Sequence, residues 1–344
     1  MRSERLQQAG ATFHSKLHNT LYFSEVFYFL LKLYARFALH IYCRKIIINK
    51  PQMLKAEGPL LLAANHPNSF LDGIIMTTLF KNGVYSLARG DAFKNSRVNR
   101  FLRSIFLLPV YRTSEGVENL GHNYTTFASC QEVFQNGGIV IIFSEGRCIN
   151  EWHLRPLKKG TARLAISSWQ KGIPLTVVPV GFNYSPFRVF GKNVHINFGE
   201  PLPKGAILEQ EGEGRQLLHF NEHLESSLKE LVYEINSEDR STIKQRLGHP
   251  VPSALRLLLA VPALVGALVH APLYYLVKWF TNKHFDNDHW DSVFNALAVV
   301  LYPLYLLLLC GGISLYANLQ AGFVALVLLP FSAWAYVQAK DQMK

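Results

Sequence analysis

The sequence predicts an α/β fold, with a mixed, largely parallel sheet flanked by helices, an N-terminal interfacial helix and C-terminal transmembrane helices. Between residues 59 and 181, short β-rich runs alternate with amphipathic stretches, which is typical of strands joined by crossover helices. Three long apolar runs follow Val251. An apolar, aromatic segment with a polar stripe precedes the first of the strands.

The N-terminal segment is basic and contains one amphipathic stretch. Residues 1–58 hold nine Lys or Arg against three Glu, in a chain whose net charge is +11. In Leu21–Cys43 the polar residues recur at helical spacing; they are Glu25, Lys32, Arg36 and His40. We expect a helix in the membrane plane with Lys32 and Arg36 snorkelling, because burial at mid-bilayer would cost about 2.5 to 3.5 kcal/mol each. The alternative is a first helix packed on the α/β domain.

Four apolar runs define the α/β domain. The expected strands are 59–64, 84–88, 139–143 and 175–181, and the expected helices lie near 71–80, 97–106, 117–136 and 159–171. Parallel sheets gather their sites at the carboxyl ends of strands. We therefore expect convergence of the residues that follow these strands, namely His66, Arg89, Glu145 and Gly181.

The C-terminal third is predicted to cross a membrane two or three times. Residues 254–280, 293–316 and 318–338 each exceed or match the roughly 20 residues that span a hydrocarbon core. Pro272 favours a kinked or re-entrant first segment. A buried helical bundle is the alternative. The basic N-terminal segment would suit nucleic acid or anionic lipid, and these apolar runs favour the lipid bilayer, with no nucleic-acid partner.

A histidine and an aspartate follow the first expected strand, in Asn-His-Pro-Asn-Ser-Phe-Leu-Asp-Gly, residues 65–73. Imidazole titrates near neutral pH, and a carboxylate on its other nitrogen fixes the tautomer. His66 is therefore a candidate general base for a hydroxyl proton, and Asp72 a candidate orienter. The alternative is that His66 ends a turn and Asp72 caps the next helix.

Three later segments follow in chain order: Leu-Leu-Pro-Val-Tyr-Arg at 107–112, Phe-Ser-Glu-Gly-Arg at 143–147 and Val-Val-Pro-Val-Gly at 177–181. Together with the His66 segment, and over roughly residues 45–205, they resemble the glycerolipid acyltransferases. That family includes the glycerol-3-phosphate and 1-acylglycerol-3-phosphate (lysophosphatidate) acyltransferases. The resemblance implies a membrane enzyme of phospholipid biosynthesis that makes phosphatidic acid or its lyso precursor.

The resemblance also implies direct acyl transfer. His66 would take the acceptor hydroxyl proton, and the alkoxide would attack a thioester of coenzyme A or of acyl carrier protein, which is a co-substrate; no cofactor is expected. A positioned base is worth about 10² to 10⁴-fold in rate. No Gly-x-Ser-x-Gly segment is present, which makes Ser69 and Ser144 weak candidates for a nucleophile.

The chain departs from the family pattern in two places. Five residues separate His66 from Asp72 where the family has four, and on a helix the extra residue would turn the carboxylate by about 100°. The pair can meet only if residues 67–69 form a turn, which Pro67 favours. Ser144 stands where the family has proline, and Arg147 alone remains of a Thr-Arg pair, so substrate binding is the property most affected.

The resemblance implies several substrate-binding residues. It assigns Arg112 to the acceptor phosphate, because a guanidinium can bind two oxygens at once. It assigns Glu145 and Gly146 to the glycerol phosphate, and Glu145 would bond a hydroxyl or hold an arginine such as Arg147.

Further residues are candidates for the same pocket. Arg155, Lys158 and Lys159 begin an expected helix whose amino end attracts anions, although paired lysines there are also common on plain surfaces. By resemblance, Pro179 would shape the acyl or acceptor pocket.

Three other functions stay open. The acceptor could be a lyso-aminolipid, whose carboxylate Arg112 would meet. His219 to His223 has the His-x-x-Glu-His spacing of zinc hydrolases, but the apolar stripe of that helix leaves both histidines on its polar side, and we expect no metal. The third function is that of a non-catalytic membrane adaptor. Against it argues the joint presence of four residues: His66, Asp72, Arg112 and Glu145.

We expect three parts: a basic segment with the interfacial helix at 1–50, the catalytic domain at 51–248, and transmembrane helices at 249–344. Residues 1–10 are polar and show no cleavable signal. The four cysteines, Cys43, Cys130, Cys148 and Cys310, have no metal or disulfide spacing. We therefore expect an integral membrane protein whose catalytic domain faces the cytoplasm.

Overall fold

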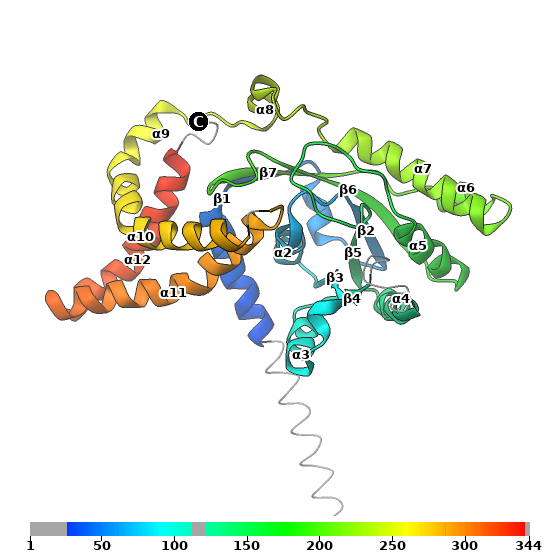
Figure 1. The fold of residues 1–344 in the computed structure, drawn as a ribbon, viewed down its shortest axis with the longest axis horizontal. Coiled ribbons are helices and arrows are strands. Elements are labelled where there is room, and N and C mark those ends of the chain that lie inside the picture. The colour runs from blue at the N-terminus through cyan, green and yellow to red at the C-terminus, as the bar shows by residue number, and fades with distance from the viewer. Residues whose placement is uncertain (1–25, 112–120, 286, 341–344) are drawn as a thin grey trace, which may run out of the picture.

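A seven-stranded mixed sheet forms the centre of the computed structural model, which describes residues 26–111, 121–285 and 287–340 (Figure 1). The strand order is β1-β7-β6-β2-β5-β3-β4. All neighbouring strands are parallel except β6 and β7, which are antiparallel. Helices cover the sheet and three long apolar helices follow it, so the predicted fold class is confirmed.

The strands are β1 (Cys43–Ile48), β2 (Leu60–Ala64), β3 (Val84–Arg89), β4 (Leu107–Val110), β5 (Ile139–Phe143), β6 (Thr176–Tyr184) and β7 (Lys192–Phe198). The helices of the α/β part are α2 (Ser69–Leu79), α3 (Ser96–Ser104), α4 (Gly121–Gln135), α5 (Gly160–Gln170), α6 (Lys204–Leu208), α7 (Glu213–Leu231) and α8 (Arg240–Leu247). Short 3₁₀ turns lie at Pro51–Lys55 and Gly90–Phe93. The C-terminal helices are α9 (Ser253–Leu258), α10 (Ala260–His284), α11 (Trp290–Tyr316) and α12 (Leu319–Ala339).

All four predicted strands exist, but β6 is longer than expected. It runs to Tyr184 because residues from Val180 onward pair with the antiparallel strand β7. Gly181 therefore lies inside a strand, and the expectation that it follows one is wrong. The expected start of the helix at 117–136 lies outside the described residues, and the structure describes α4 over Gly121–Gln135.

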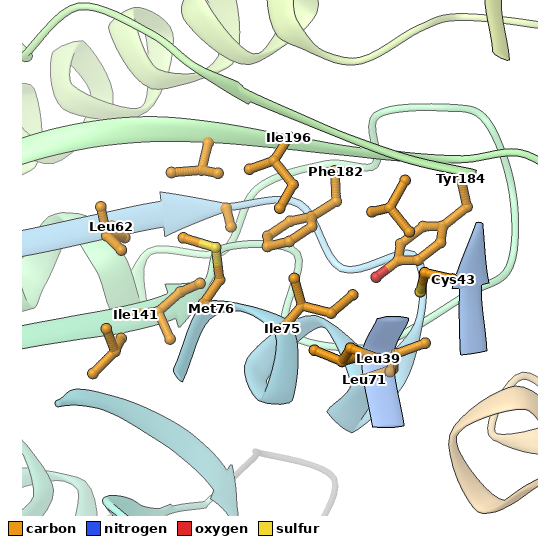
Figure 2. Close-up of a cluster of buried hydrophobic side chains, with 14 of the residues drawn as sticks. Leu39, Cys43, Leu62, Leu71, Ile75, Met76, Ile141, Phe182, Tyr184 and Ile196 are labelled. Carbon is orange, nitrogen blue, oxygen red and sulfur yellow. The ribbon is translucent and has the colours of Figure 1, made fainter. Parts of the chain in front are cut away.

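The sheet is buried on both faces, as expected for its parallel part. Leu60, Leu62 and Ala64 of β2 face one core, while Leu61 and Ala63 face the other. Figure 2 shows the first core, in which Leu71, Ile75 and Met76 of α2 pack beneath residues of β2, β5, β6 and β7. The second core is covered by α4, α5 and α7. These two layers hold the ends of β2 and β5 in fixed positions.

The N-terminal helix, described over residues 26–42, packs on the end of α2. Lys32 donates to the carbonyl of Phe80 at 2.6 Å, and Arg36 donates through Nε to the carbonyl of Thr78 at 2.8 Å. These contacts are those expected for the alternative, a first helix packed on the α/β domain. The two cations satisfy carbonyls at the carboxyl end of α2, where cations are favoured. The opposite face of the helix remains apolar and exposed, at Val26, Phe27, Phe29, Leu30, Leu33 and Phe37.

Three helices, α10, α11 and α12, are long and apolar enough to cross a membrane. Many of their apolar side chains are exposed, among them Leu315 and Leu308 of α11 at 92% and 74%. Figure 1 shows that α10 bends sharply, and Pro272 lies inside it, where it removes a backbone donor. The amino end of α11 lies beside α2, so the C-terminal segment contacts the α/β part directly.

Candidate active site

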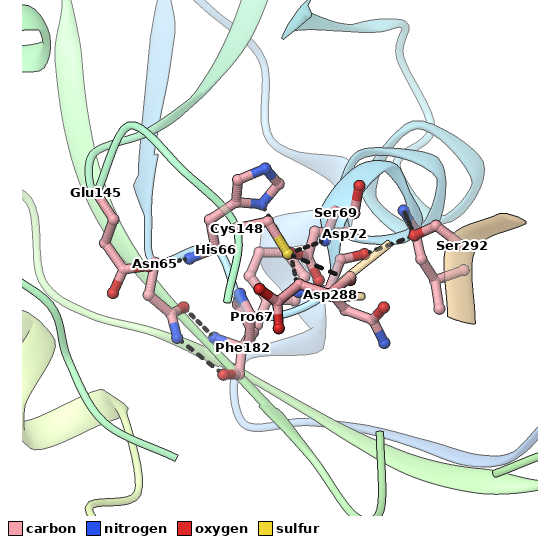
Figure 3. Close-up of polar contacts among 12 residues, drawn as sticks. Asn65, His66, Pro67, Ser69, Asp72, Glu145, Cys148, Phe182, Asp288 and Ser292 are labelled. Carbon is pink, nitrogen blue, oxygen red and sulfur yellow. Dashed lines mark hydrogen bonds and ion pairs between the residues drawn. The ribbon is translucent and has the colours of Figure 1, made fainter. Parts of the chain in front are cut away.

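His66 and Asp72 meet at the carboxyl end of β2. Nδ1 of His66 lies 2.9 Å from Oδ2 of Asp72, whose carboxylate is fully buried, while the imidazole keeps 13% of its surface exposed (Figure 3). With Nδ1–H donating to the carboxylate, Nε2 is the nitrogen able to accept a proton. The imidazole stacks on the ring of Phe143, with centroids 3.9 Å apart and planes 14° apart.

The turn between His66 and Asp72 absorbs the extra residue noted in the sequence. Ser69, the first residue of α2, has a φ of +49°, so the turn enters the helix through a left-handed residue. Asn68, at the N-cap of α2, donates its backbone N–H to Oδ2 of Asp72 at 2.9 Å. Asp72 thus sits in the first turn of the helix and faces back toward the imidazole.

The second oxygen of Asp72 is also occupied. Tyr184 of β6 donates its hydroxyl to Oδ1 at 2.6 Å. Burial, followed by the neighbouring Asp72 carboxylate, raises the pKa of Tyr184 well above its ordinary value, so the hydroxyl keeps its proton and donates it. With three donors on two oxygens, the carboxylate has a single orientation.

Asn65 ties the same loop to the sheet. Its side chain exchanges two hydrogen bonds with the backbone of Phe182, donating to the carbonyl at 3.0 Å and accepting from the N–H at 2.7 Å. The residue before His66 is therefore fixed to β6, so His66 leaves the strand in a defined direction.

Glu145 lies in the turn after β5 and is buried at 4% exposure. Its Oε2 accepts the backbone N–H of His66 at 2.8 Å, and its Oε1 accepts the backbone N–H of Arg155 at 3.0 Å. Burial raises the pKa of this carboxyl to about 7, and the two N–H bonds oppose the shift. Glu145 therefore holds two backbone amides, rather than the Arg147 side chain that the sequence suggested.

Residues 45–183 match a family model described as Acyltransferase. This segment is similar to acyltransferase domains, and it contains His66, Asp72 and Glu145. The match agrees with the family resemblance predicted from the motifs.

Several solved structures are similar to this chain. One of them is the crystal structure of the 1-acyl-sn-glycerophosphate (LPA) acyltransferase PlsC from Thermotoga maritima, at 18% identity and a TM-score of 0.41, covering 58% of this chain and 79% of that one. No curated protein matches the sequence.

The cations predicted to bind the substrate take different positions. Three of these side chains are exposed: Arg147, which lies shortly after β5, and Lys158 and Lys159, which lie just before α5. Arg155 is half-buried and its guanidinium bonds Glu151 at 3.0 Å. Arg112 lies outside the described residues. Arg89, at the end of β3, bonds Asp91 at 2.6 Å.

Two further predicted residues have structural surroundings. Gly146 has a φ of +73°, and a Cβ there would lie 3.0 Å from Cγ of Lys158. Pro179 lies inside β6, opposite Ala63 of β2, where its carbonyl accepts the N–H of Gly199 at 2.9 Å. Pro179 is therefore level with the next-to-last residue of β2, the strand that His66 follows.

The start of α11 supplies site residues that sequence reasoning missed. Asp291 accepts the side-chain amide of Asn68 at 2.7 Å, and Ser292 donates to the carbonyl of Asn68 at 2.9 Å. His289 Nδ1 lies 2.8 Å from the hydroxyl of Ser69. One signal was available, because Asp291 is an acid at the start of an otherwise apolar helix, and such acids often have a functional partner.

The zinc motif lies elsewhere. His219 and His223 are on α7, which covers the other core, with their Nε2 atoms 3.1 Å apart. Glu222 is 3.6 Å from His219. Within the described ranges, no group of three His, Cys, Asp or Glu side chains is arranged to hold a metal ion.

Proposed function

We propose that the protein transfers a fatty acyl group from an acyl thioester to the hydroxyl of glycerol-3-phosphate or 1-acylglycerol-3-phosphate. The acyltransferase family supplies the reaction class. The observation that carries the mechanism is the 2.9 Å contact between His66 Nδ1 and a fully buried Asp72. Because Nδ1 is bonded to Asp72, Nε2 is the nitrogen left to act as the general base.

The transfer needs one base and no covalent enzyme intermediate. Nε2 of His66 takes the hydroxyl proton while the acceptor oxygen attacks the thioester carbonyl carbon. The tetrahedral intermediate collapses, the C–S bond breaks, and the thiolate takes the proton from the imidazolium. Asp72 stabilises the imidazolium between these two steps, since its carboxylate accepts from Nδ1 throughout.

An anionic, lipid-derived acceptor fits the surroundings of His66. Glu145 bonds the backbone of Arg155 and so links two loops that carry exposed cations, namely Arg147, Lys158 and Lys159. These cations can attract a phosphate without being buried. Three helices long and apolar enough to cross a membrane, the second of which begins beside the turn of His66, favour an integral membrane protein that would meet lysolipids in the bilayer. We place the catalytic domain on the cytoplasmic side, where acyl-CoA or acyl carrier protein is the donor.

The test is acyl transfer by the purified protein, using labelled acyl thioesters. We expect His66→Ala to lower kcat by about 10² to 10⁴-fold. His219→Ala on α7 is the matched control and should keep native activity. Transfer that survives His66→Ala would overturn the assignment of the base.

The acceptor class is tested with a panel. We expect native protein to acylate glycerol-3-phosphate or 1-acylglycerol-3-phosphate, and Arg147→Ala with Lys158→Ala to raise KM for these phosphates. A protein that acylates only a lyso-aminolipid would refute the phosphate acceptor and leave the acyltransferase reaction standing.

A further inference from the structure

A buried ion pair lies behind the turn that carries His66. Lys192 of β7 bonds the carboxylate of Asp291 in α11, and both side chains are completely buried. Tyr42, at the end of the N-terminal helix, donates its hydroxyl to the other oxygen of Asp291. One carboxylate thus joins the N-terminal helix, strand β7 of the sheet and the first turn of α11.

The same carboxylate reaches the catalytic turn through Asn68. Asn68 donates its side-chain amide to Asp291 at 2.7 Å and its backbone N–H to Asp72 at 2.9 Å. It therefore lies between two buried carboxylates, which would repel each other without the charge of Lys192. The carbonyl of Asn68 accepts from Ser292, so three of its polar groups are held.

The buried ion pair of Lys192 and Asp291 orients Asn68 but contributes little to stability. A buried ion pair adds little net stability, because the cost of removing both charges from water offsets their attraction. Oδ1 of Asn68 is also buried and has no hydrogen-bond partner among the described residues, which is a further cost. Apolar side chains in place of Lys192 and Asp291 would stabilise the fold at least equally, but they could not orient Asn68.

We propose that Asp291 is a positioning residue of the active site: through Asn68, it holds the turn in which His66 and Asp72 face each other. The proposal rests on the proposed function for its catalytic consequence. It makes the first turn of α11 part of the catalytic machinery in addition to its role in the apolar C-terminal segment.

Two double variants isolate the acceptor for Asn68. The first, called the leucine pair, combines Lys192→Met with Asp291→Leu. It removes both charges and the acceptor, so no buried charge is left unpaired. The second, called the asparagine pair, combines Lys192→Met with Asp291→Asn, which also removes both charges but keeps an oxygen for Asn68. We expect the leucine pair to lower kcat by about 10²-fold, as for a displaced catalytic group, with KM for the thioester changed less than about threefold. The asparagine pair should recover most of that loss.

A double-mutant cycle separates positioning from general destabilisation. If Asp291 acts through the His66–Asp72 pair, the leucine pair should lower the residual kcat of Asp72→Asn by less than about threefold. A full additional loss of about 10²-fold in the Asp72→Asn background would overturn the proposal.

A second readout does not depend on acyl transfer. Cys148 is buried against this turn, accepting the N–H of Ser69 at 2.9 Å and lying 3.8 Å from the carbonyl of Asp288. If the turn loosens, maleimide should label Cys148 faster in the leucine pair than in native protein or the asparagine pair, as located by peptide mass. Cys130 on α4, in the other core, is the internal control for global unfolding.

The outcomes are distinct. Native protein that acylates no acceptor refutes the proposed function, while labelling of Cys148 still decides the role of Asp291. Equal labelling of Cys148 in the two double variants overturns the proposal. Labelling of Cys130 together with Cys148 would also overturn it, because Asp291 would then support the whole fold and not one turn.

Discussion

At the scale of single residues, Glu145 connects the base to the second loop of the site. Its two oxygens accept backbone N–H groups of His66 and Arg155, so its ionisation affects both segments. A carboxylate accepts both bonds, whereas a protonated carboxyl has one oxygen that must donate. The pH dependence of the protein should therefore contain a contribution from this residue.

The pKa of Glu145 is about 7 in the folded protein and 4.5 in its ordinary state. The folded protein therefore keeps a proton that the unfolded chain has lost, and stability falls as pH rises from 4.5 to 7. The full effect is on the order of 3 kcal/mol. We expect the Tm of native protein, relative to Glu145→Gln, to fall over this range. Glu151→Gln, on the same loop, is the control and should follow native protein; a flat difference between native and Glu145→Gln would contradict the prediction.

Gly146 and Gly172 form a matched pair for testing the turn after β5. Both have positive φ, at +73° and +77°, so alanine at either should cost about 1 to 2 kcal/mol of stability. Only at Gly146 would the new Cβ press on Lys158, while Gly172 faces open space. We expect similar losses of Tm but a fall in kcat/KM for Gly146→Ala alone. Equal activity in the two variants would show that this turn does not position the site.

At the scale of elements, the apolar runs predicted β2, β3, β5 and β6 to within a few residues. β2 and β5 are runs of mostly aliphatic side chains buried on both faces, which is the pattern of a central parallel strand. β1, β4 and β7 were not predicted. β4 is only four residues long and contains Pro109.

β7 shows why polar strands escape prediction. It contains Lys192, Asn193 and His195, which are buried although their side chains are polar. Asn193 donates to the carbonyl of Leu247 at 2.9 Å, and Lys192 pairs with Asp291. Partners this distant in the chain cannot be read from the local pattern, so the strand resembles a surface segment.

The N-terminal helix supports α2 through its cations. Arg36→Met should lower the unfolding free energy by about 1 kcal/mol, because Arg36 bonds the carbonyls of Thr78 and Leu79 at the end of α2. Asp72 lies in the first turn at the other end, so kcat should change less than about threefold. Arg163→Met, an exposed arginine of α5, is the control for Tm. An unchanged Tm for Arg36→Met would mean that water replaces these bonds.

At the scale of the whole molecule, the sequence was enough to predict the His66–Asp72 pair but not its contact with Asp291 through Asn68. His66 and Asp72 lie within one short segment, so local chemistry was enough to pair them. Asp291 lies 223 residues after Asn68, in a helix that reads as a membrane span. The contact between the two exists only because α11 begins beside α2, which no local pattern describes.

The C-terminal helices should therefore be needed for folding of the α/β part. A chain that ends at Gly248 lacks Asp291 and leaves Lys192 buried without its counter-charge, which typically costs 3 to 5 kcal/mol, roughly. That is a large part of the 5 to 15 kcal/mol, approximately, that stabilises a domain. We expect this chain to be inactive and protease-sensitive, and Lys192→Met to restore part of its protease resistance but not its activity.

A chain that ends at Ala317 is the matched control, since it loses α12 but keeps Asp291 and its bonds to Tyr42, Lys192 and Asn68. Limited proteolysis and acyl transfer in detergent compare the two chains. We expect the longer one to protect β7 and retain transfer. If the chain ending at Gly248 were as resistant and as active, the apolar helices would serve only for attachment, and the coupling through Asp291 would be wrong.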